Sequence, residues 1–292
     1  MSFDRLSSMY AGHAVYGLRL EGPAIVDVSP FFLLASPETG PRISVRYEAT
    51  RPAYTGAPYV DEVGAELDLP EERWLQLDRS RSEAAYFGSL LTPDQLAHPY
   101  VGPLAIIFNR WLGREVFHAG AFVADERAWV VVGQREAGKS SLLAAIADNG
   151  IDVLADDISV TDGEQIFTGP RCLDLRQPLP GIRMSLSRAR DDTRWRLLLP
   201  HGPASCPVGG WLFLRWGDEL SLTPVPASKL LRRLARHRLR THLQSDPSIL
   251  LALANRPAWV VTRPRSWAGV DGTVAAIVST VAAAHRSTSD VG

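Results

Sequence analysis

The chain has 292 residues, of which 46% are hydrophobic and 22% charged, a balance typical of a folded globular protein with enough core for one large or two ordinary domains. The formal net charge of −1 gives no electrostatic reason to expect a nucleic acid or an anionic membrane surface as a partner. Two cysteines are too few for a disulfide framework, and no apolar run is long enough to cross a bilayer, so we expect a cytoplasmic protein.

The first part of the chain alternates short strand patterns with turn residues. Strands are expected over residues 14–20, 42–48, 74–79 and 83–90, with proline-containing stretches between them. The sequence Thr-Pro-Asp at 92–94 predicts the start of a helical region that continues to about residue 112, with a break at His98-Pro99. These patterns predict a β-rich N-terminal region over residues 1–112.

From residue 113 the pattern changes to longer apolar segments. In chain order we expect a hairpin of 116–124 with 128–133, a helix over 140–148, a strand over 152–155, a second hairpin of 209–216 with 219–225, and helices over 227–244 and 270–285. Residues 287–292 are expected to form a flexible tail. The prediction is a mixed α/β fold, with a second domain over 113–286.

A glycine-rich loop separates the apolar strand that ends at residue 132 from the helix that follows it. Its sequence, GQREAGKS, fits the pattern G-x-x-x-x-G-K-[ST]. Backbone N–H groups converge on an anion in such a loop, and the dipole of the following helix favours negative charge there. Lys139 would reach the β- and γ-phosphates of a nucleotide, and Ser140 would bind Mg²⁺. The residues predicted to contact the nucleotide here are Gly133, Gln134, Arg135, Glu136, Ala137, Gly138, Lys139, Ser140 and Ser141.

Lysine is rare in this chain, because 29 of its 31 basic residues other than histidine are arginines. A position that keeps lysine is therefore one where a compact ammonium on a flexible stem fits. Arg135 and Glu136 are bulky for a loop that wraps phosphates, so we expect both to point to solvent, with Arg135 offsetting Glu136. Reduced nucleotide affinity is the alternative, and an ordinary strand-to-helix turn with a surface lysine is the alternative to any phosphate site.

Two adjacent aspartates, Asp156 and Asp157, end the strand that follows the loop helix. Neighbouring residues at a strand end point to different sides, so the two carboxylates can have separate roles. One can hold Mg²⁺ together with Ser140, while the other accepts the proton of an attacking hydroxyl. A solvated turn with a local cap is the alternative.

The segments FHAGAF, WVVVGQREAGKSS and GIDVLADDISV together resemble the catalytic core of HPr kinase/phosphorylase and its relatives with the PEP-carboxykinase-like nucleotide fold. That family has a histidine on the strand before the loop hairpin and an L-x-A-D-D strand at this spacing; the resemblance covers residues 117–176. It implies a P-loop-containing core that uses ATP and Mg²⁺. It also implies Asp156 as the general base, Asp157 on the magnesium side, and His118 beside the phosphates as a catalytic residue with Lys139. Considered without the family, His118 is better explained as a satisfied strand histidine than as a functional residue.

The sequence LDLR at 173–176 is similar to a reduced form of the L-E-I-R-G signature of that family. The resemblance implies a metal role for Asp174 and a phosphate contact for Arg176, although an ordinary strand with an outward acid and base has the same pattern. Ser141 stands where the bacterial HPr enzymes usually carry glutamate, and the glycines of the signature are missing. These departures argue against HPr as the substrate and are closer to relatives found with ribosomal peptides such as lasso peptides, which phosphorylate a precursor-peptide serine.

Residues 229–240, KLLRRLARHRLR, have a basic amphipathic pattern. The leucines form one face and the arginines the other, which usually indicates a solvated helix face. A docking surface for an acidic peptide or for the nucleotide is the alternative, while nucleic acid is less favoured because no aromatic stacking module accompanies the charge.

These patterns together predict a Mg-ATP-dependent kinase that transfers phosphate to a serine or threonine of a peptide or small protein, with a lasso-type precursor peptide as one candidate. The alternatives are a nucleotide-binding regulator or scaffold without phosphotransfer and a small-molecule kinase. We expect no nucleic-acid or membrane partner, and the chain could form a homo-oligomer.

Overall fold

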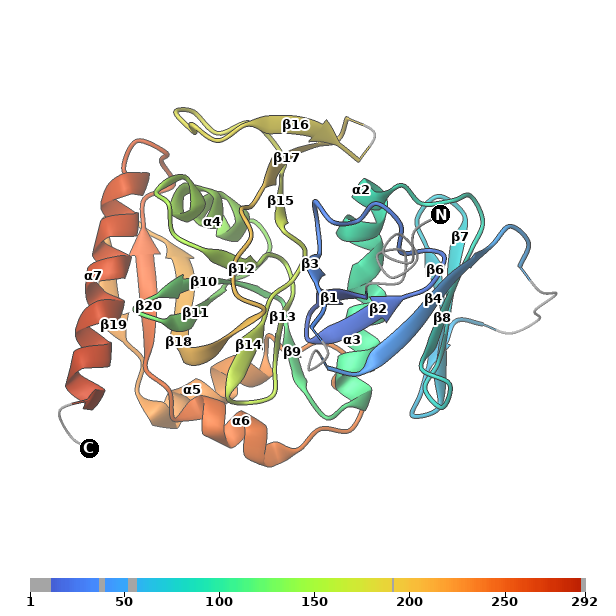
Figure 1. Ribbon diagram of the computed structural model, residues 1–292. Coiled ribbons are helices and arrows are strands. Elements are labelled where there is room, and N and C mark those ends of the chain that lie inside the picture. The colour runs from blue at the N-terminus through green and yellow to red at the C-terminus, as the bar shows by residue number, and fades with distance from the viewer. Residues whose placement is uncertain (1–11, 37–39, 52–56, 191, 290–292) are drawn as a thin grey trace.

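An eight-stranded sheet forms the N-terminal part of the computed structural model, which describes residues 12–36, 40–51, 57–190 and 192–289 (Figure 1). The strand order is β3-β1-β2-β4-β8-β7-β6-β5. Its strands are β1 (His13–Val15), β2 (Leu18–Glu21), β3 (Leu33–Leu34), β4 (Arg42–Glu48), β5 (Tyr59–Val60), β6 (Gly64–Leu69), β7 (Arg73–Asp78) and β8 (Glu83–Phe87). The N-terminal region is therefore β-rich, as predicted. The single strand expected over 14–20 is wrong, because Tyr16 and Gly17 both have positive φ and turn the chain into the β1–β2 hairpin.

A helical segment follows the N-terminal sheet as α2 (Pro93–Gln95), η1 (Leu96–Tyr100) and α3 (Val101–Trp111). Thr92 caps it: its hydroxyl accepts from Gln95 N, and the Gln95 side chain accepts from Thr92 N. His98 is not helical, with φ −156° and ψ 120°, so the predicted break is confirmed. In Figure 1, α3 lies between the N-terminal sheet and the rest of the molecule. Its apolar residues share one cluster with Val116 and Val160, so the boundary at residues 112 and 113 stays a prediction.

A nine-stranded mixed sheet forms the centre of the second part of the chain. Along its main path the order is β12-β10-β11-β18-β14-β13-β9, and β20 pairs with β18 and β19. Its strands are β9 (Glu115–Phe117), β10 (Ala119–Ala124), β11 (Arg127–Val132), β12 (Val153–Ala155), β13 (Ser159–Thr161), β14 (Gln165–Phe167), β18 (Ser205–Trp216), β19 (Ser221–Pro224) and β20 (Ala258–Arg263).

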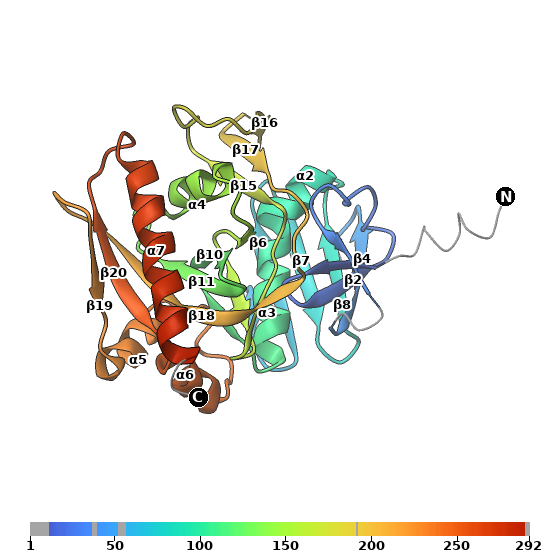
Figure 2. The ribbon, with the colours of Figure 1, turned by 60° about the vertical axis from the view of Figure 1, so that its left-hand side comes forward.

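Helices cover both faces of the central sheet (Figures 1 and 2). Alternating residues of β11 show why: Trp129 and Val131 pack with α4 (Lys139–Asp148) and α7 (Val270–Ser289), whereas Val130 and Val132 pack with α5 (Ala227–Ala235) and α6 (Pro247–Ala254). A strand that is buried on both sides reads as a continuous apolar run, as this one does. A small three-stranded sheet, in the order β15-β17-β16, packs beside α4; its strands are β15 (Cys172–Leu175), β16 (Leu186–Ala189) and β17 (Arg194–Leu198). Among the described residues, no helix combines the length and the apolar character needed to span a membrane.

The central strands β11, β18 and β20 are parallel to one another. Their carboxyl ends therefore meet at one edge of the sheet, where Gly133, Trp216 and Arg263 lie next to one another in the strand order. Open α/β sheets bind ligands outside the carboxyl ends of such strands. This edge is where the glycine-rich loop leaves β11.

Three predicted elements of this part are wrong. The strand expected over 116–124 is interrupted at His118, because β9 pairs with β13 while β10 pairs with β11 and β12. The second hairpin does not form, since β20 lies between β18 and β19. The helix expected over 227–244 ends at Ala235, and the chain then pairs alongside β9. In addition, α7 continues to Ser289, into the segment predicted as a tail; residues 290–292 lie outside the described residues.

Candidate functional site

The loop from Gly133 to Gly138 joins the end of β11 to the start of α4, the strand–loop–helix order that the motif predicts. Glu136 and Gly138 both lie in the left-handed region, with φ of 67° and 79°. Such conformations turn successive N–H groups toward one concave side, which can bind an anion. Gln134, Arg135 and Glu136 are exposed, in keeping with the prediction that the bulky middle of the loop faces solvent.

Two residues at neighbouring strand ends hold this loop in place. Trp216 Nε1 donates to the carbonyl of Glu136 at 3.1 Å, and Arg263 Nη2 donates to the carbonyls of Ala137 and Gly138 at 3.2 and 3.1 Å. The Arg263 guanidinium lies 4.1 Å from the Trp216 ring centroid, and burial lowers the pKa of Arg263 to about 10. Neither residue was predicted from the sequence, although both end strands that are parallel to β11.

The Glu136 carboxylate pairs with Arg176, whose Nη1 lies 2.6 Å from Glu136 Oε1. This hydrogen bond is the main cause that lowers the pKa of Glu136, while Arg135 contributes less. The expected role of Arg135 as the residue that offsets Glu136 therefore falls mainly to Arg176. Arg176 lies beside the loop, and its phosphate contact stays a prediction.

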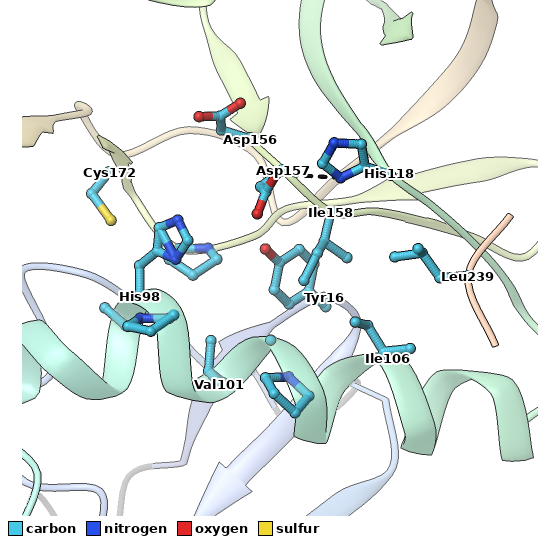
Figure 3. Close-up of a pocket in the computed structure, with 15 residues that line it drawn as sticks. Tyr16, His98, Val101, Ile106, His118, Asp156, Asp157, Ile158, Cys172 and Leu239 are labelled. Atoms are coloured by element: carbon cyan, nitrogen blue, oxygen red, sulfur yellow. Dashed lines mark ion pairs between the residues drawn. The ribbon is translucent and has the colours of Figure 1, made fainter. Parts of the chain in front are cut away.

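Lys139 is almost fully buried, and its ammonium points back along the loop. Its Nζ lies 3.0 Å from the carbonyl oxygen of Gly133 and 3.1 Å from His118 Nε2. An ammonium has only donors, so His118 Nε2 must accept and its proton must sit on Nδ1. Nδ1 in turn lies 3.3 Å from the carboxylate of Asp157 (Figure 3). The structure thus connects Lys139, His118 and Asp157, which are far apart in sequence.

Burial and charge both act on this chain of contacts. Burial is the main cause that lowers the pKa of His118, and the positive charge of Lys139 lowers it further. Burial also lowers the pKa of Lys139, while Asp156 and Asp157 act in the opposite direction. His118 is therefore a neutral imidazole near pH 7, able to accept from the ammonium and to donate to the carboxylate.

The paired aspartates form a tight turn directly after β12. Asp157 has a φ of 64°, and Ile158 N donates to the carbonyl of Asp156 at 2.8 Å. Ser140, the second residue of α4, lies close enough to Asp156 to lower its pKa, so the turn faces the start of the loop helix. Burial, followed by repulsion from Asp157, raises the pKa of Asp156 to about 7 against the opposing effects of Ser140 and Lys139. Such a carboxyl group is poised to exchange a proton near neutral pH.

The acid pair also fits the predicted magnesium ion. Asp156 Oδ1 is buried and has no hydrogen-bond partner among the described residues, and the Asp157 side chain is half exposed. Mg²⁺ prefers oxygen ligands and is usually bound by one or two carboxylates together with phosphates and water. Within the described ranges, no group of three or more His, Cys, Asp or Glu residues could enclose a metal by itself. The oxygens of Ser140 and the two aspartates suit an ion that is shared with a phosphate.

Asp174, the other predicted metal residue, has a different partner. Its two carboxylate oxygens accept from Arg196 Nε and Nη2 at 2.6 and 2.8 Å, and the pair is almost fully buried. Arg196 also donates to Asp94 Oδ1 at 2.6 Å and to the carbonyl of His98 at 3.1 Å. These contacts tie the small sheet to α2 and η1. They favour a structural role for Asp174 over the predicted metal role.

A cavity of 220 Å³ opens beside the acid pair (Figure 3). Asp156, Asp157 and His118 lie together in it, and most of its remaining wall is apolar, from η1, α3 and the turn after β12. Tyr16 and His98 from the N-terminal region also line it. Burial lowers the pKa of His98, which is therefore neutral near pH 7. The N-terminal half of the chain thus supplies one wall of the cavity, which the sequence did not predict.

Two wider hollows adjoin the loop on its outer side. One, of 540 Å³, lies over the carboxyl ends of β11, β18 and β20. The other, of 820 Å³, lies between the loop and α5 and is strongly basic. His118 lines both the basic hollow and the cavity at the acid pair, so the two meet at this residue.

Of the comparisons with known proteins, only the search of solved structures gives matches. No family model matches the chain, and no curated protein matches it. A search of solved structures finds the Hpr(Ser) kinase/phosphatase from Coxiella burnetii, at 12% sequence identity and a TM-score of 0.31, over 60% of this chain and 98% of that one. A likeness of this size does not establish a family or an activity.

Proposed function

We propose that this protein is a Mg-ATP-dependent phosphotransferase that phosphorylates a hydroxyl group. The observation that carries the proposal is the position of Asp156: a buried carboxyl group with a pKa near 7 that faces Ser140 at the start of the loop helix. A base near neutral pH and an anion-binding loop are the two parts that transfer of a phosphoryl group to a hydroxyl requires.

The loop and Lys139 hold the phosphates in this proposal. The left-handed residues of the loop turn its N–H groups toward a common centre, and the helix dipole of α4 adds positive potential there. The Lys139 ammonium, now shared between the Gly133 carbonyl and His118, reaches the β- and γ-phosphates. Ser140 and Asp157 would hold Mg²⁺, which would neutralise negative charge on the phosphates.

Asp156 receives the proton that the acceptor loses. The hydroxyl oxygen of the acceptor forms a bond to the γ-phosphorus while the bond between that phosphorus and the bridging oxygen breaks, and ADP leaves with the electron pair. The hydroxyl proton passes to Asp156, whose raised pKa makes it a stronger base than an ordinary carboxylate. His118 keeps Asp157 and Lys139 in position through its two ring nitrogens.

The acceptor in this proposal is a serine or threonine of a peptide or small protein. The 220 Å³ cavity beside Asp156 has room for one side chain and little more, which suits a residue presented by an extended segment. Its apolar wall excludes water from the reacting oxygen, and this limits hydrolysis of the nucleotide. A ribosomal precursor peptide of the lasso type is the first acceptor to test.

The decisive experiment measures ATP binding and phosphate transfer separately in matched variants. ATP binding is followed by calorimetry with Mg²⁺, and transfer by labelled phosphate entering serine- and threonine-containing peptides. Lys139→Ala should weaken ATP binding by about 10–100-fold, because it removes a charge-assisted contact. Asp156→Asn should bind ATP and lose about 10²–10⁴ in transfer rate.

Asp152→Asn is the matched control, because it replaces an aspartate by asparagine in the same way. Asp152 is exposed and lies at the other end of β12 from Asp156. Transfer by Asp156→Asn at the rate of this control would exclude Asp156 as the base. Tight ATP binding with no transfer by the wild-type protein to any peptide would favour the alternative, a nucleotide-binding regulator.

A further inference from the structure

The 820 Å³ hollow between the loop and α5, here called the basic groove, concentrates positive charge beside the candidate site. The chain as a whole has a net charge of −1, yet the described residues that line this groove include no aspartate or glutamate. Its six cationic side chains are Arg135, Lys229, Arg232, Arg233, Arg236 and Arg238. A patch of one charge sign attracts an oppositely charged partner and steers its approach.

The helix α5 presents these cations in a single row. Lys229 lies three and four residues before the adjacent Arg232 and Arg233, which puts these three on one helix face. Arg236, the residue that caps the helix, lies three and four residues after the same pair and continues this face. Leu230 and Leu234 are buried and fix the opposite face against the central sheet. Among the described residues, only Arg238 of the six has an ion-pair partner, the buried Glu115. The remaining five cations leave their charge available to a ligand.

The chain after α5 brings this row to the catalytic residues. Leu239 N donates to the carbonyl of Val116 at 2.8 Å, and His118 N donates to that of His237 at 2.9 Å. His118 and Leu239 consequently line both the basic groove and the cavity that contains Asp156. A ligand that lies in the groove can therefore extend past His118 into the cavity.

We infer that the basic groove binds an acidic segment of the acceptor peptide, next to the residue whose hydroxyl enters the cavity. The inference that the bound peptide is a phosphate acceptor rests on the proposed function. The inference that the groove binds an acidic peptide does not. A triphosphate already has the loop N–H groups and Lys139, so five further cations exceed its needs. An extended peptide with several carboxylates matches the length of the row and its charge.

The test measures peptide binding without nucleotide, by fluorescence anisotropy. The probe is a fluorescein-labelled peptide in which a serine stands between two runs of glutamates, and its reference has glutamines in their place. The glutamate peptide should bind about tenfold or more tightly than the glutamine peptide, with an affinity that falls as salt rises. Equal affinity for the two peptides would overturn the inference.

Charge reversal then locates the binding site. Lys229→Glu with Arg232→Glu should lower the affinity for the glutamate peptide by about tenfold or more, since both positions face the groove. Arg240→Glu with Arg256→Glu makes the same charge change at two positions that do not line the groove. Equal effects of the two pairs would overturn the inference. If the charge-reversed pair does not fold, Lys229→Gln with Arg232→Gln replaces it as a milder pair. This pair should also lower the affinity for the glutamate peptide, by less than the charge-reversed pair would.

Two further measurements separate this inference from its competitors. Loss of ATP affinity with unchanged peptide binding in the Lys229 and Arg232 variants would assign the groove to the nucleotide and overturn the inference. Tighter binding of a single-stranded oligonucleotide than of the glutamate peptide would also overturn it. Peptide binding by a wild-type protein that transfers no phosphate would leave the groove established and remove the proposed function.

Discussion

Lys139 Nζ lies 3.1 Å from His118 Nε2, so the loop lysine donates a hydrogen bond to a neutral imidazole. The other nitrogen of the same ring faces Asp157 at 3.3 Å. One histidine thus links the loop lysine to Asp157, the two residues that we propose bind phosphate and Mg²⁺. His118 lies where the strand pattern is interrupted, between β9 and β10. A γ-phosphate would replace His118 as the partner of the ammonium.

The rate of transfer should rise with pH through the pKa of Asp156. The base works only when it is ionised, and its pKa is raised to about 7, so kcat/KM should increase up to about pH 7 and then level off. Asp157→Asn removes the repulsion that helps to raise this pKa, and should therefore move the midpoint to lower pH even though the maximal rate falls. Initial rates across this pH range check the prediction. A midpoint near the ordinary carboxyl value of 3.8, or one unmoved in Asp157→Asn, would contradict it.

Ionisation of Asp156 should lower the stability of the folded protein. The folded-state pKa of Asp156 is about 7, above the value of 3.8 expected in the unfolded chain. Between these values the folded state binds the extra proton, so the free energy of unfolding should fall as pH rises through this window and level off above it. Asp156→Asn stays neutral and avoids this loss. At pH 8 it should be more stable than the wild type by on the order of 2 kcal/mol, and the gain should shrink toward pH 4.

Urea unfolding at the two pH values, without Mg²⁺ or nucleotide, measures the difference. Asp152→Asn is the control, because an exposed carboxylate should change stability little at either pH. A less stable Asp156→Asn protein at pH 8 would show that the ionised carboxylate is better accommodated than its burial indicates.

The sequence allowed us to predict the part of the candidate site that is formed by elements next to one another in the chain. A glycine-rich loop between an apolar strand and a helix has few other conformations, and an acid pair at the end of the next strand must lie near the same sheet edge. Local order does not show which distant strands are neighbours. Arg263 and Trp216 hold the loop only because β20 and β18 run parallel to β11. The wall that η1 and α3 contribute depends on packing between segments far apart in the chain.

The errors in predicted elements have one cause, which is competition from tertiary pairing. The segments 209–216 and 219–225 have the pattern of a hairpin, but β20 supplies parallel partners for β18 and antiparallel partners for β19. The helix expected to reach residue 244 stops at Ala235, because the following residues gain hydrogen bonds with Val116 and His118. The amphipathic pattern correctly identified the buried Leu230 and Leu234, while Leu231 is 37% exposed.

Glu115 should be among the residues most important for stability. It is fully buried and receives Arg110 Nη1 at 2.9 Å and Arg238 Nε at 2.7 Å, which ties α3 to the segment after α5. Glu115→Gln leaves the buried Arg110 and the partly buried Arg238 without a carboxylate and should cost about 3–5 kcal/mol. Glu48→Gln, in an exposed pair with Arg46, should cost less than about 1 kcal/mol. Denaturant unfolding compares the two, and equal losses would show that the buried cluster contributes little.

Gly138 offers a way to test how the loop is held. Gly138 and Gly150 have nearly the same φ, 79° and 76°, so alanine at either position carries the same cost of a left-handed backbone, about 1–2 kcal/mol. A Cβ at Gly138 would lie 2.5 Å from Arg263 Nη2 and 3.0 Å from Trp216. Among the described residues, a Cβ at Gly150 would have no heavy atom within 4 Å apart from those of its own chain neighbours. Gly138→Ala should therefore displace the two residues that hold the loop.

The expected result is a loss of ATP affinity of about tenfold or more in Gly138→Ala, equivalent to one or two lost hydrogen bonds. Gly150→Ala should unfold at a lower denaturant concentration than the wild type but keep its ATP affinity, because it lies at the far end of α4. Calorimetric titration of both variants with ATP and Mg²⁺ separates the two effects. Equal ATP affinities would mean that Arg263 and Trp216 support the fold of the loop without setting its shape for phosphate.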